Sequence, residues 1–433
     1  MSNLCQKRLL RELTLFEKND QLAMAIDYNE QNVREIKALI IGPSETPYAF
    51  GFYHLSLVFT EAYPAVPPTV KLLNTNSGMT RFGPNIYADG KICLTWPGTP
   101  QEEWSQAMGF ESCLLSIQTL LAENPYRLEP GFEESDDKEN IDTYNAKISH
   151  ENLRLTVIEP LEREMGISQD PFRHAKFGQG EDGKPSSELG SFINYCKRRF
   201  LWHREEYMKT IQAGIARGVG GRRSTPFPLT QFEYPGNQMV GRWDWYGLKA
   251  RFEILEKAVS QEIQGWATAG LELAKKDTNL AFNLRHQMKS VVEQMAVRSQ
   301  AVFNVGLVDD NPFLWYMTYF GRAGTPLDEG VFKINIHISP NHPKVQPRVY
   351  LDNPIPHVRV ASDGMLAYLP QYAPEMVRHI EGILFALEDT GPVYNPLMAV
   401  NGENTRLFWG TPQEKRLYTR RLRRCVTESI DKL

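Results

Sequence analysis

The chain has 433 residues, of which 42% are hydrophobic and 23% are charged, and its formal net charge is -4 at pH 7. This length suffices for two or three domains, and the composition is typical of a soluble globular protein. The slightly acidic balance argues against a general nucleic-acid binder, because the short basic runs at 197–199 and 420–424 are typical of solvated helix faces. We therefore expect no nucleic-acid partner.

Five widely spaced cysteines are present, without a C-x-x-C pair. This pattern excludes a dense disulfide framework and a cysteine-rich zinc site, so we predict no metal and no small-molecule cofactor. Unpaired cysteines favour a reducing compartment, either the cytoplasm or the nucleus. The N-terminal residues lack the apolar core of a signal peptide, and no apolar run is long enough for a membrane span. We therefore expect no membrane partner.

The first part of the chain has the pattern of an α+β fold. Residues 3–17 alternate apolar and basic positions as in an amphipathic helix. Strands are expected at 33–41, 54–59 and 70–73, and further helices at 110–122 and 139–164. Three prolines in 63–68 predict a rigid crossing of polyproline-II type, because proline fixes φ and removes an amide donor. The helix at 110–122 should bury Cys113 in the core.

The remaining segments suggest how the chain is divided. Residues 167–188 are rich in glycine, proline and charge and predict a mobile loop. A helix is expected over 192–215, a linker over 218–228, and helical structure from 245 to about 302. The predicted domains are 1–165, a loop, helix and linker over 166–244, and a helical lead-in with a second domain over 245–433.

A long-range internal repeat is the most informative feature of the sequence. Residues 42–73 align with 321–351, so that Gly42 falls on Gly321. Further along, the Asp-Gly pair at 89–90 falls on the Asp-Gly pair at 363–364. We therefore predict two structurally related copies.

The copies differ where reactive side chains stand. In the same alignment Cys93 falls on Ala367, and Asn85 falls on Arg359. The Asp-Gly turn is kept, whereas the two chemically capable side chains are present in one copy only. This pattern is typical of one active and one degenerate copy.

A series of short motifs runs through the first copy in a fixed order. The motifs are Gly42-Pro43, Thr46-Pro47-Tyr48, Tyr63-Pro64, Pro67-Pro68, Pro84-Asn85, Cys93-Leu94 and Trp104-Ser105. With this series the first copy resembles the ubiquitin-conjugating enzyme (UBC) family, in which Pro-Asn precedes the catalytic cysteine by eight residues. The resemblance implies the UBC fold, a four-stranded antiparallel meander flanked by helices, in tandem with a second, catalytically inactive UBC-like domain from 311 to about 432.

The resemblance can be narrowed within the family. Residues 123–134, 144–157 and 191–200 look most like the large type charged by the second, non-standard ubiquitin-activating enzyme. That type also handles a second ubiquitin-like modifier, and it also lacks the histidine that precedes Pro-Asn in most members. Gly83 occupies that position here, which puts the rigidity of the loop in doubt. The second half of the chain is not part of that type.

The resemblance implies a chemistry for Cys93. The cysteine would accept the C-terminal carboxyl group of ubiquitin, or of a ubiquitin-like protein, from an activating enzyme as a thioester, and then pass it to a lysine. No imidazole base is required, because thioester exchange joins two thiols of similar pKa. Asn85 would stabilise the oxyanion or hold the loop, and Asp89 would form a turn or act as a general base.

Further residues are candidates for binding. Tyr87, Trp96 and Trp104 would line the groove for the modifier's tail, although Trp104 also fits core packing. The cations of the first helix would contact the activating enzyme or form a solvated face; they are Lys7, Arg8 and Arg11. A ubiquitin ligase is the family's further partner, but Ala65 and Gln106-Ala107 stand where its usual contacts lie.

Two alternatives remain to the transferase hypothesis. In the first, both copies are non-catalytic scaffolds that bind ubiquitin or a ligase. In the second, Cys93 is the nucleophile of a hydrolase, which would require a histidine base. The first domain offers only His54 and His150, and neither stands in a protease-like motif.

Overall fold

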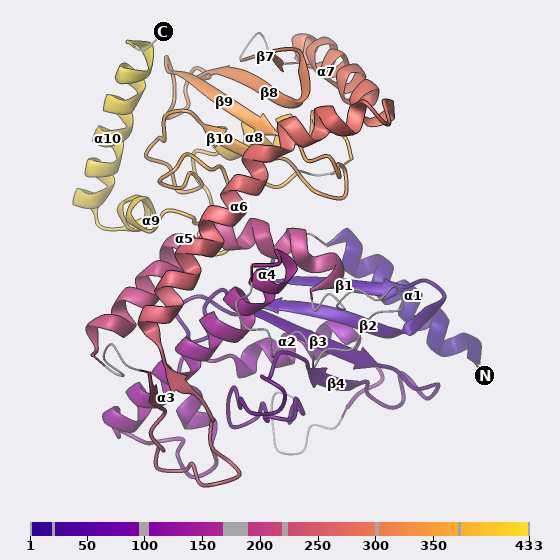
Figure 1. Cartoon of the computed structure of the whole chain (residues 1–433), viewed down its shortest axis with the longest axis vertical. Helices are drawn as coiled ribbons and strands as arrows, with labels where there is room; N and C mark the ends of the chain where they lie inside the picture. Colours follow the sequence, from indigo (N-terminus) through magenta and orange to yellow (C-terminus); the bar gives the residue numbers. More distant parts are fainter. Residues whose placement is uncertain are drawn as a thin grey trace. The chain divides into compact units, whose positions relative to one another are not determined.

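The computed structural model describes residues 2–19, 22–94, 104–167, 189–218, 224–298, 303–370 and 374–431. By packing, the chain divides into two compact units, Met1–Phe200 with Tyr207–Leu255 and Leu201–Glu206 with Glu256–Leu433. This division differs from the boundaries expected after residues 165 and 244, because later segments pack into the first unit. Each unit contains a four-stranded sheet (Figure 1).

The first unit is an antiparallel meander with helices, as expected. Its sheet has the order β1-β2-β3-β4, and β2 is the longest strand. The strands are β1 (Met24–Asn29), β2 (Asn32–Ile41), β3 (Phe52–Val58) and β4 (Thr69–Leu72). The helices are α1 (Ser2–Lys18), α2 (Phe110–Leu120), η1 (Pro125–Leu128), α3 (Lys138–Glu151), η2 (Asn152–Ile158), α4 (Glu159–Glu164), η3 (Gly190–Phe192) and α5 (Ile193–Ala216). A short ribbon, β5 (Thr225–Pro226) with β6 (Arg242–Trp243), precedes α6 (Trp245–Ala274).

The predicted helix 139–164 is α3, η2 and α4 in succession, with a π-helical stretch at η2. Its expected apolar positions are buried, and so is Cys113 in α2. Helix α1 also forms as predicted, but its buried face is narrower than expected. Residues four apart turn toward the sheet, as helical periodicity requires. The buried side chains are Cys5, Leu9, Leu13 and Phe16, whereas Leu4, Leu10 and Leu15 are exposed.

The proline-rich crossing is a tight turn, so the polyproline-II prediction is wrong. The amides of Ala65 and Val66 both donate to the carbonyl of Ala62, at 2.7 and 3.2 Å, which folds the chain back on itself. The Tyr63–Pro64 peptide is cis. Tyr63 is buried and packs edge-on against Phe59, so the turn is part of the core.

Of the predicted linker 218–228, the structure describes Gly218 and residues 224–228; they are exposed except for Phe227, which is half-buried, and the linker stays a prediction. Phe227 lies against Trp243, and Phe232 farther along is buried against Tyr126 and Tyr144. Glycine, proline and serine mark turns, and such turns occur in packed connections as well as in free linkers. Residues 168–188, for which a mobile loop was predicted, and 219–223 lie outside the described residues.

The second unit repeats the meander with the sheet order β10-β9-β8-β7. Its strands are β7 (Phe303–Val308), β8 (Asn311–Phe320), β9 (Val331–His337) and β10 (Arg348–Leu351). Its further helices are α7 (Asn279–Arg298), α8 (Met376–Glu388), α9 (Gly402–Trp409) and α10 (Pro412–Ile430). The strand lengths match those of the first sheet one for one, and a cis X–Pro bond recurs at His342–Pro343. The predicted tandem fold is confirmed.

Candidate active site

The loop after β4 brings Cys93 and Asn85 together through the main chain. The amide of Cys93 donates to the carbonyl of Asn85 at 2.8 Å. Between them a tight turn closes where the amide of Gly90 donates to the carbonyl of Tyr87 at 3.0 Å. Gly90 has φ +87°, and a Cβ there would lie 2.2 Å from the carbonyl oxygen of Leu72. The turn therefore requires glycine, and it fixes the register of the two candidate residues.

Cys93 differs from most of the other cysteines in its exposure. It is half-buried, as is Cys425, whereas the remaining three are buried. Burial raises the pKa of the Cys113 thiol to about 12 and that of the Cys196 thiol well above its ordinary value. A thiolate is the nucleophile in acyl exchange, so these buried thiols are unsuited to it. Cys93 is the half-buried cysteine of the first unit.

Asn85 has the exposure that an oxyanion donor needs. Its side chain is half-buried, and it makes no hydrogen bond within the described ranges, which omit 95–103. The backbone of Asn85 is held by Cys93, while its side-chain amide is left without a structural bond of its own there. The oxyanion role and the loop-holding role both remain predictions for this amide.

Among the other candidate residues, Asp89 and Trp104 make structural hydrogen bonds, whereas the ring of Tyr87 is partly exposed. The carboxylate of Asp89 accepts a hydrogen bond from the amide of Lys91 at 2.9 Å, as a turn residue does. Tyr87 is 37% exposed, and the guanidinium of Arg81 lies 5.3 Å from the centre of its ring. Trp104 donates from Nε1 to the carbonyl of Pro64 at 2.6 Å, which supports core packing. Trp96 lies outside the described residues.

The second unit contains the same turn without the reactive side chains. The amide of Ala367 donates to the carbonyl of Arg359 at 2.8 Å, the same bond that joins Cys93 to Asn85. The guanidinium of Arg359 pairs with Asp389 at 2.9 Å and lies over the ring of Phe385. Ala367 is fully buried. This position therefore lacks the nucleophile and also the exposure.

Comparison with known proteins agrees with this geometry. The family model described as "Ubiquitin-conjugating enzyme" matches residues 8–149 and 284–387, together more than half of the chain. The chain belongs to the ubiquitin-conjugating enzyme family. The second matched segment contains most of the repeat, so both copies are recognised as UBC domains.

Several curated relatives are similar to the first UBC domain. Ubiquitin-conjugating enzyme E2 Z of Xenopus tropicalis is 40% identical over 165 residues, which cover 37% of this chain and 52% of the relative. The protein of the same name from Homo sapiens is 38% identical over 162 residues, covering 36% and 45%. A probable ubiquitin-conjugating enzyme protein 17 of Caenorhabditis elegans is 38% identical over 170 residues, covering 36% and 23%. The match thus spans about half or less of each relative's length.

Helix α1 of this UBC domain presents two of its three candidate cations to solvent. Lys7 and Arg11 are exposed. Arg8 is half-buried, pairs with Glu12, and donates to the carbonyl of Ala107 at 3.4 Å. Glu12 in turn accepts a hydrogen bond from the hydroxyl of Tyr63 at 2.7 Å. Arg8 therefore ties α1 to the rest of the domain, and contact with an activating enzyme stays a prediction for Lys7 and Arg11.

Neither histidine considered for a hydrolase is placed as a base for Cys93. His54 is buried, both of its ring nitrogens lack hydrogen-bond partners among the described residues, and burial lowers its pKa to about 4. His150 has both nitrogens engaged, Nε2 with the amide of Asp244 at 2.9 Å and Nδ1 with Glu151 at 3.0 Å. A cysteine–histidine dyad with either histidine is therefore unsupported.

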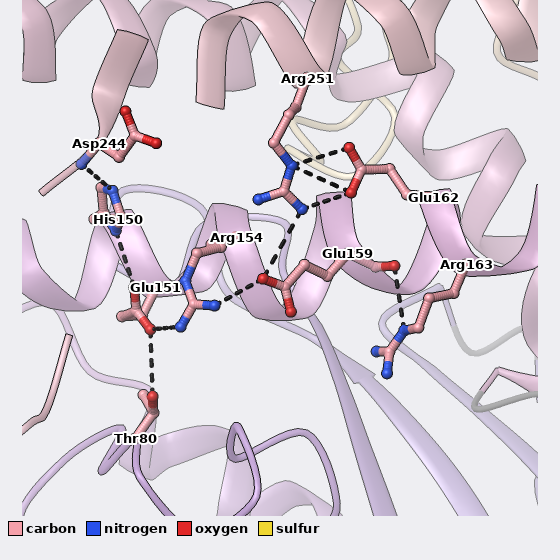
Figure 2. Close-up of polar contacts among 9 residues, drawn as sticks. All are labelled: Thr80, His150, Glu151, Arg154, Glu159, Glu162, Arg163, Asp244 and Arg251. Atoms are coloured by element: carbon pink, nitrogen blue, oxygen red, sulfur yellow. Dashed lines mark hydrogen bonds and ion pairs between the residues drawn. The ribbon is translucent and has the colours of Figure 1, made fainter. Parts of the chain in front are cut away.

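A buried polar network around His150 was not anticipated from the sequence. Figure 2 shows Glu151 between His150 and Arg154; it accepts hydrogen bonds from both of them and from Thr80. Burial alone would raise the pKa of Glu151, but the charge of Arg154 and these hydrogen bonds lower it to about 2. The network continues from Arg154 through Glu159 to Arg251, which also pairs with Glu162. The sequence signal that could have indicated this network is the set of charged residues within the predicted buried helix 139–164.

The described residues contain no cluster of three or more histidine, cysteine or acidic side chains that could hold a metal ion. Within the same residues, no helix combines the length and the apolar character needed to cross a bilayer.

Proposed function

We propose that the first UBC domain is a conjugating transferase for ubiquitin or a ubiquitin-like modifier. The single observation that carries this proposal is the half-buried Cys93, whose backbone is bonded to Asn85 in a glycine-dependent turn. The second domain keeps the turn but has Ala367 at the corresponding position. It is a non-catalytic scaffold in this proposal.

The chemistry proceeds in two acyl transfers. The thiolate of Cys93 attacks the carbonyl carbon of the modifier's thioester on the activating enzyme; a new C–S bond forms, and the enzyme's thiolate leaves. A lysine amine of the substrate then attacks the same carbon, loses its proton to solvent, and releases Cys93 as thiolate. The side-chain amide of Asn85 stabilises the oxyanion in the second step, a contribution of about 2.7–4 kcal/mol in comparable sites.

A charging assay tests the proposal. The full chain is incubated with ubiquitin, ATP and each of the two kinds of ubiquitin-activating enzyme, and the products are separated under non-reducing conditions. We expect a thiol-sensitive adduct that is absent in Cys93→Ala and retained in Cys425→Ala, the matched half-buried cysteine. Absence of an adduct with both activating enzymes would favour the alternative in which both domains are binding scaffolds. The missing ligase contacts at Ala65 and Gln106-Ala107 are compatible with that alternative.

A further inference from the structure

Asn85 lies in a loop that lacks the family's histidine. Hydrogen bonds from residues outside the loop fix its backbone nonetheless. The hydroxyl of Tyr48 donates to the carbonyl of Phe82 at 2.6 Å. A Cβ at Gly83 would lie only 3.1 Å from that hydroxyl. Tyr48 therefore limits the space at the position where the histidine would stand, and it bonds the loop at Phe82, three residues before Asn85.

Arg81 provides contacts on both sides of Asn85. Its Nη2 donates to the carbonyl of Pro84 at 2.6 Å, and its guanidinium lies over the ring of Tyr87. Arg81 is only 6% exposed. A buried guanidinium has five donors in a rigid fork, so it can fix several groups at once, which a lysine cannot.

The guanidinium is itself held by residues outside the loop. Its Nη1 donates to the side-chain and main-chain oxygens of Asn237, the latter at 3.3 Å, and its Nη2 lies 3.5 Å from the carboxylate of Glu129. Asn237 belongs to the segment 224–244, which was predicted to include a linker. The same segment contacts the approach to the loop, where the amide of Val240 donates to the carbonyl of Met79 at 3.3 Å.

A second anchor lies one residue before Arg81. The hydroxyl of Thr80 donates to Glu151 at 3.2 Å and thereby joins the loop to the buried network of Figure 2. In that network Glu151 is bonded to His150, which accepts the amide of Asp244. Residues 79–81, which precede Asn85, are thus bonded to the segment 224–244 either directly or through Glu151 and His150.

We propose that Arg81, held by Asn237, is a positioning residue that sets Asn85 for transfer of the modifier to lysine. This inference rests on the proposed function and extends it. Among the described residues no hydrogen bond joins Arg81 to Cys93; Arg81 acts through Pro84 and Tyr87 on Asn85, which lies between them in the chain. The first step, in which Cys93 is charged, does not depend on the Asn85 amide, so only the second step should require Arg81.

The test separates the two steps in the full chain. Each variant is charged with ubiquitin, activating enzyme and ATP, charging is stopped by removing ATP, and free lysine is added. Loss of the thioester is then followed on non-reducing gels. The variants are Asn85→Ala, Arg81→Ala, Arg81→Lys, Asn237→Ala, Asn237→Asp and the double variant of Asn85→Ala with Arg81→Ala. Arg127→Ala, which removes an exposed arginine, is the matched control.

We expect charging within about 3-fold of the wild type throughout, because thioester exchange does not use this amide. Asn85→Ala should slow discharge about 10²–10³-fold, as loss of an oxyanion donor does. Arg81→Ala should slow it about 10–100-fold, the order expected when a catalytic group is misplaced by about 1 Å. Arg81→Lys should not restore the rate, Asn237→Asp should retain it better than Asn237→Ala, and Arg127→Ala should leave it unchanged.

The double variant distinguishes positioning from general damage. If Arg81 acts through Asn85, adding Arg81→Ala to Asn85→Ala should slow discharge by no more than about 2-fold further. A full additional loss would overturn the inference, and so would wild-type discharge in Arg81→Ala when Asn85→Ala is slow. If Arg81→Ala fails to charge or to fold, the Asn237 pair decides: equal discharge in Asn237→Ala and Asn237→Asp contradicts the inference. Absence of charging in the wild type would instead reject the proposed function.

Discussion

The two UBC domains share one turn, and they differ in what surrounds it. In both, an Asp-Gly pair closes the turn, and an amide eight residues after the asparagine or arginine donates back to it at 2.8 Å. In the first domain this bond joins the backbone of a half-buried cysteine to that of an asparagine whose side-chain amide makes no hydrogen bond among the described residues. In the second, Ala367 is fully buried, and Arg359 is bound to Asp389. The two copies therefore differ in the solvent access of this position as well as in its side chains.

The Asp side chains show the same division. Asp89 is exposed and accepts only the amide of Lys91 among the described residues. Its counterpart Asp363 accepts the equivalent amide, of Met365, at 3.1 Å, and also pairs with Arg204 within the second unit. The aspartate of the turn is therefore exposed in the first copy, whereas in the second copy it pairs with Arg204 of α5. The comparison teaches that the fold of the turn and the function of the site can be separated.

The largest effect is expected when a cysteine is moved from one copy to the other. Ala367→Cys in a Cys93→Ala background should give no ubiquitin adduct, because a buried thiol has a raised pKa and no access to the activating enzyme. The adduct is measured on non-reducing gels, with the wild type as the positive control. An adduct at a tenth of the wild-type level or more would show that burial is not what prevents the second copy from being charged.

The next effect concerns the packed segment 224–244 of the first unit. Lys147 and Glu233 form a buried ion pair, in which burial lowers the pKa of Lys147. Lys147→Ala leaves the carboxylate without its partner and should reduce the free energy of unfolding by about 3–5 kcal/mol. Lys249→Ala, at an exposed pair, should change it by about 1 kcal/mol or less. Urea unfolding of the full chain checks this, and equal effects of both variants would contradict the integral role of the segment.

A matched pair of glycines tests whether the turn is structural in both copies. Gly90 and Gly364 have φ of +87° and +89°, and a Cβ at either would lie 2.2 Å from a carbonyl oxygen, of Leu72 or Leu351. Gly90→Ala and Gly364→Ala should each cost about 1–3 kcal/mol of stability. Thermal unfolding of the full chain measures both. A cost at Gly90 alone would mean that the second turn has lost its structural role.

The last effect is a pH dependence to which one histidine of each copy should contribute. Burial lowers the pKa of His54 to about 4, and burial with the charge of Arg359 lowers that of His357 to about 3. The unfolded chain binds these protons near pH 6.5, so stability is full above that pH and falls as the pH decreases toward the folded pKa. Each histidine contributes a slope of at most about 1.4 kcal/mol per pH unit.

Removing one histidine measures its contribution to the pH dependence of stability. His54→Phe should flatten the slope between pH 6.5 and 4, whereas His286→Gln, at an exposed position, should leave it unchanged. Stability is measured by urea unfolding at a series of pH values. An unchanged slope in His54→Phe would show that the pKa of His54 is not lowered in the folded protein.

Much of the fold could be predicted from the sequence, because hydrophobic periodicity and the repeat depend on local pattern. The strands at 33–41, 54–59 and 70–73 and the second copy follow from these patterns. Strand β1 was not identified by its residues, because its six positions become a strand through pairing with β2. The turn at Tyr63–Pro64 was missed because prolines specify local φ but not the reversal that tertiary packing imposes.

The candidate site was predictable to a smaller extent. Motif spacing identified Cys93 and Asn85, and the repeat identified Ala367 and Arg359 as their counterparts. The burial of Ala367 and the bond between Arg81 and Asn237 could not be predicted, because both depend on segments distant in sequence. Asn237, 156 residues after Arg81, lies beyond the predicted linker 218–228, and no contact was predicted for it. Only the folded chain places it against the loop.

One measurement tests the central claim most directly. The full chain is charged with ubiquitin, its intact mass is determined without reducing agent, and the modified cysteine is located by proteolysis and mass spectrometry. The account predicts one thiol-sensitive ubiquitin per chain, attached at Cys93, with no modification at Cys425. Attachment at any other cysteine, or the absence of an adduct with both kinds of activating enzyme, would contradict it.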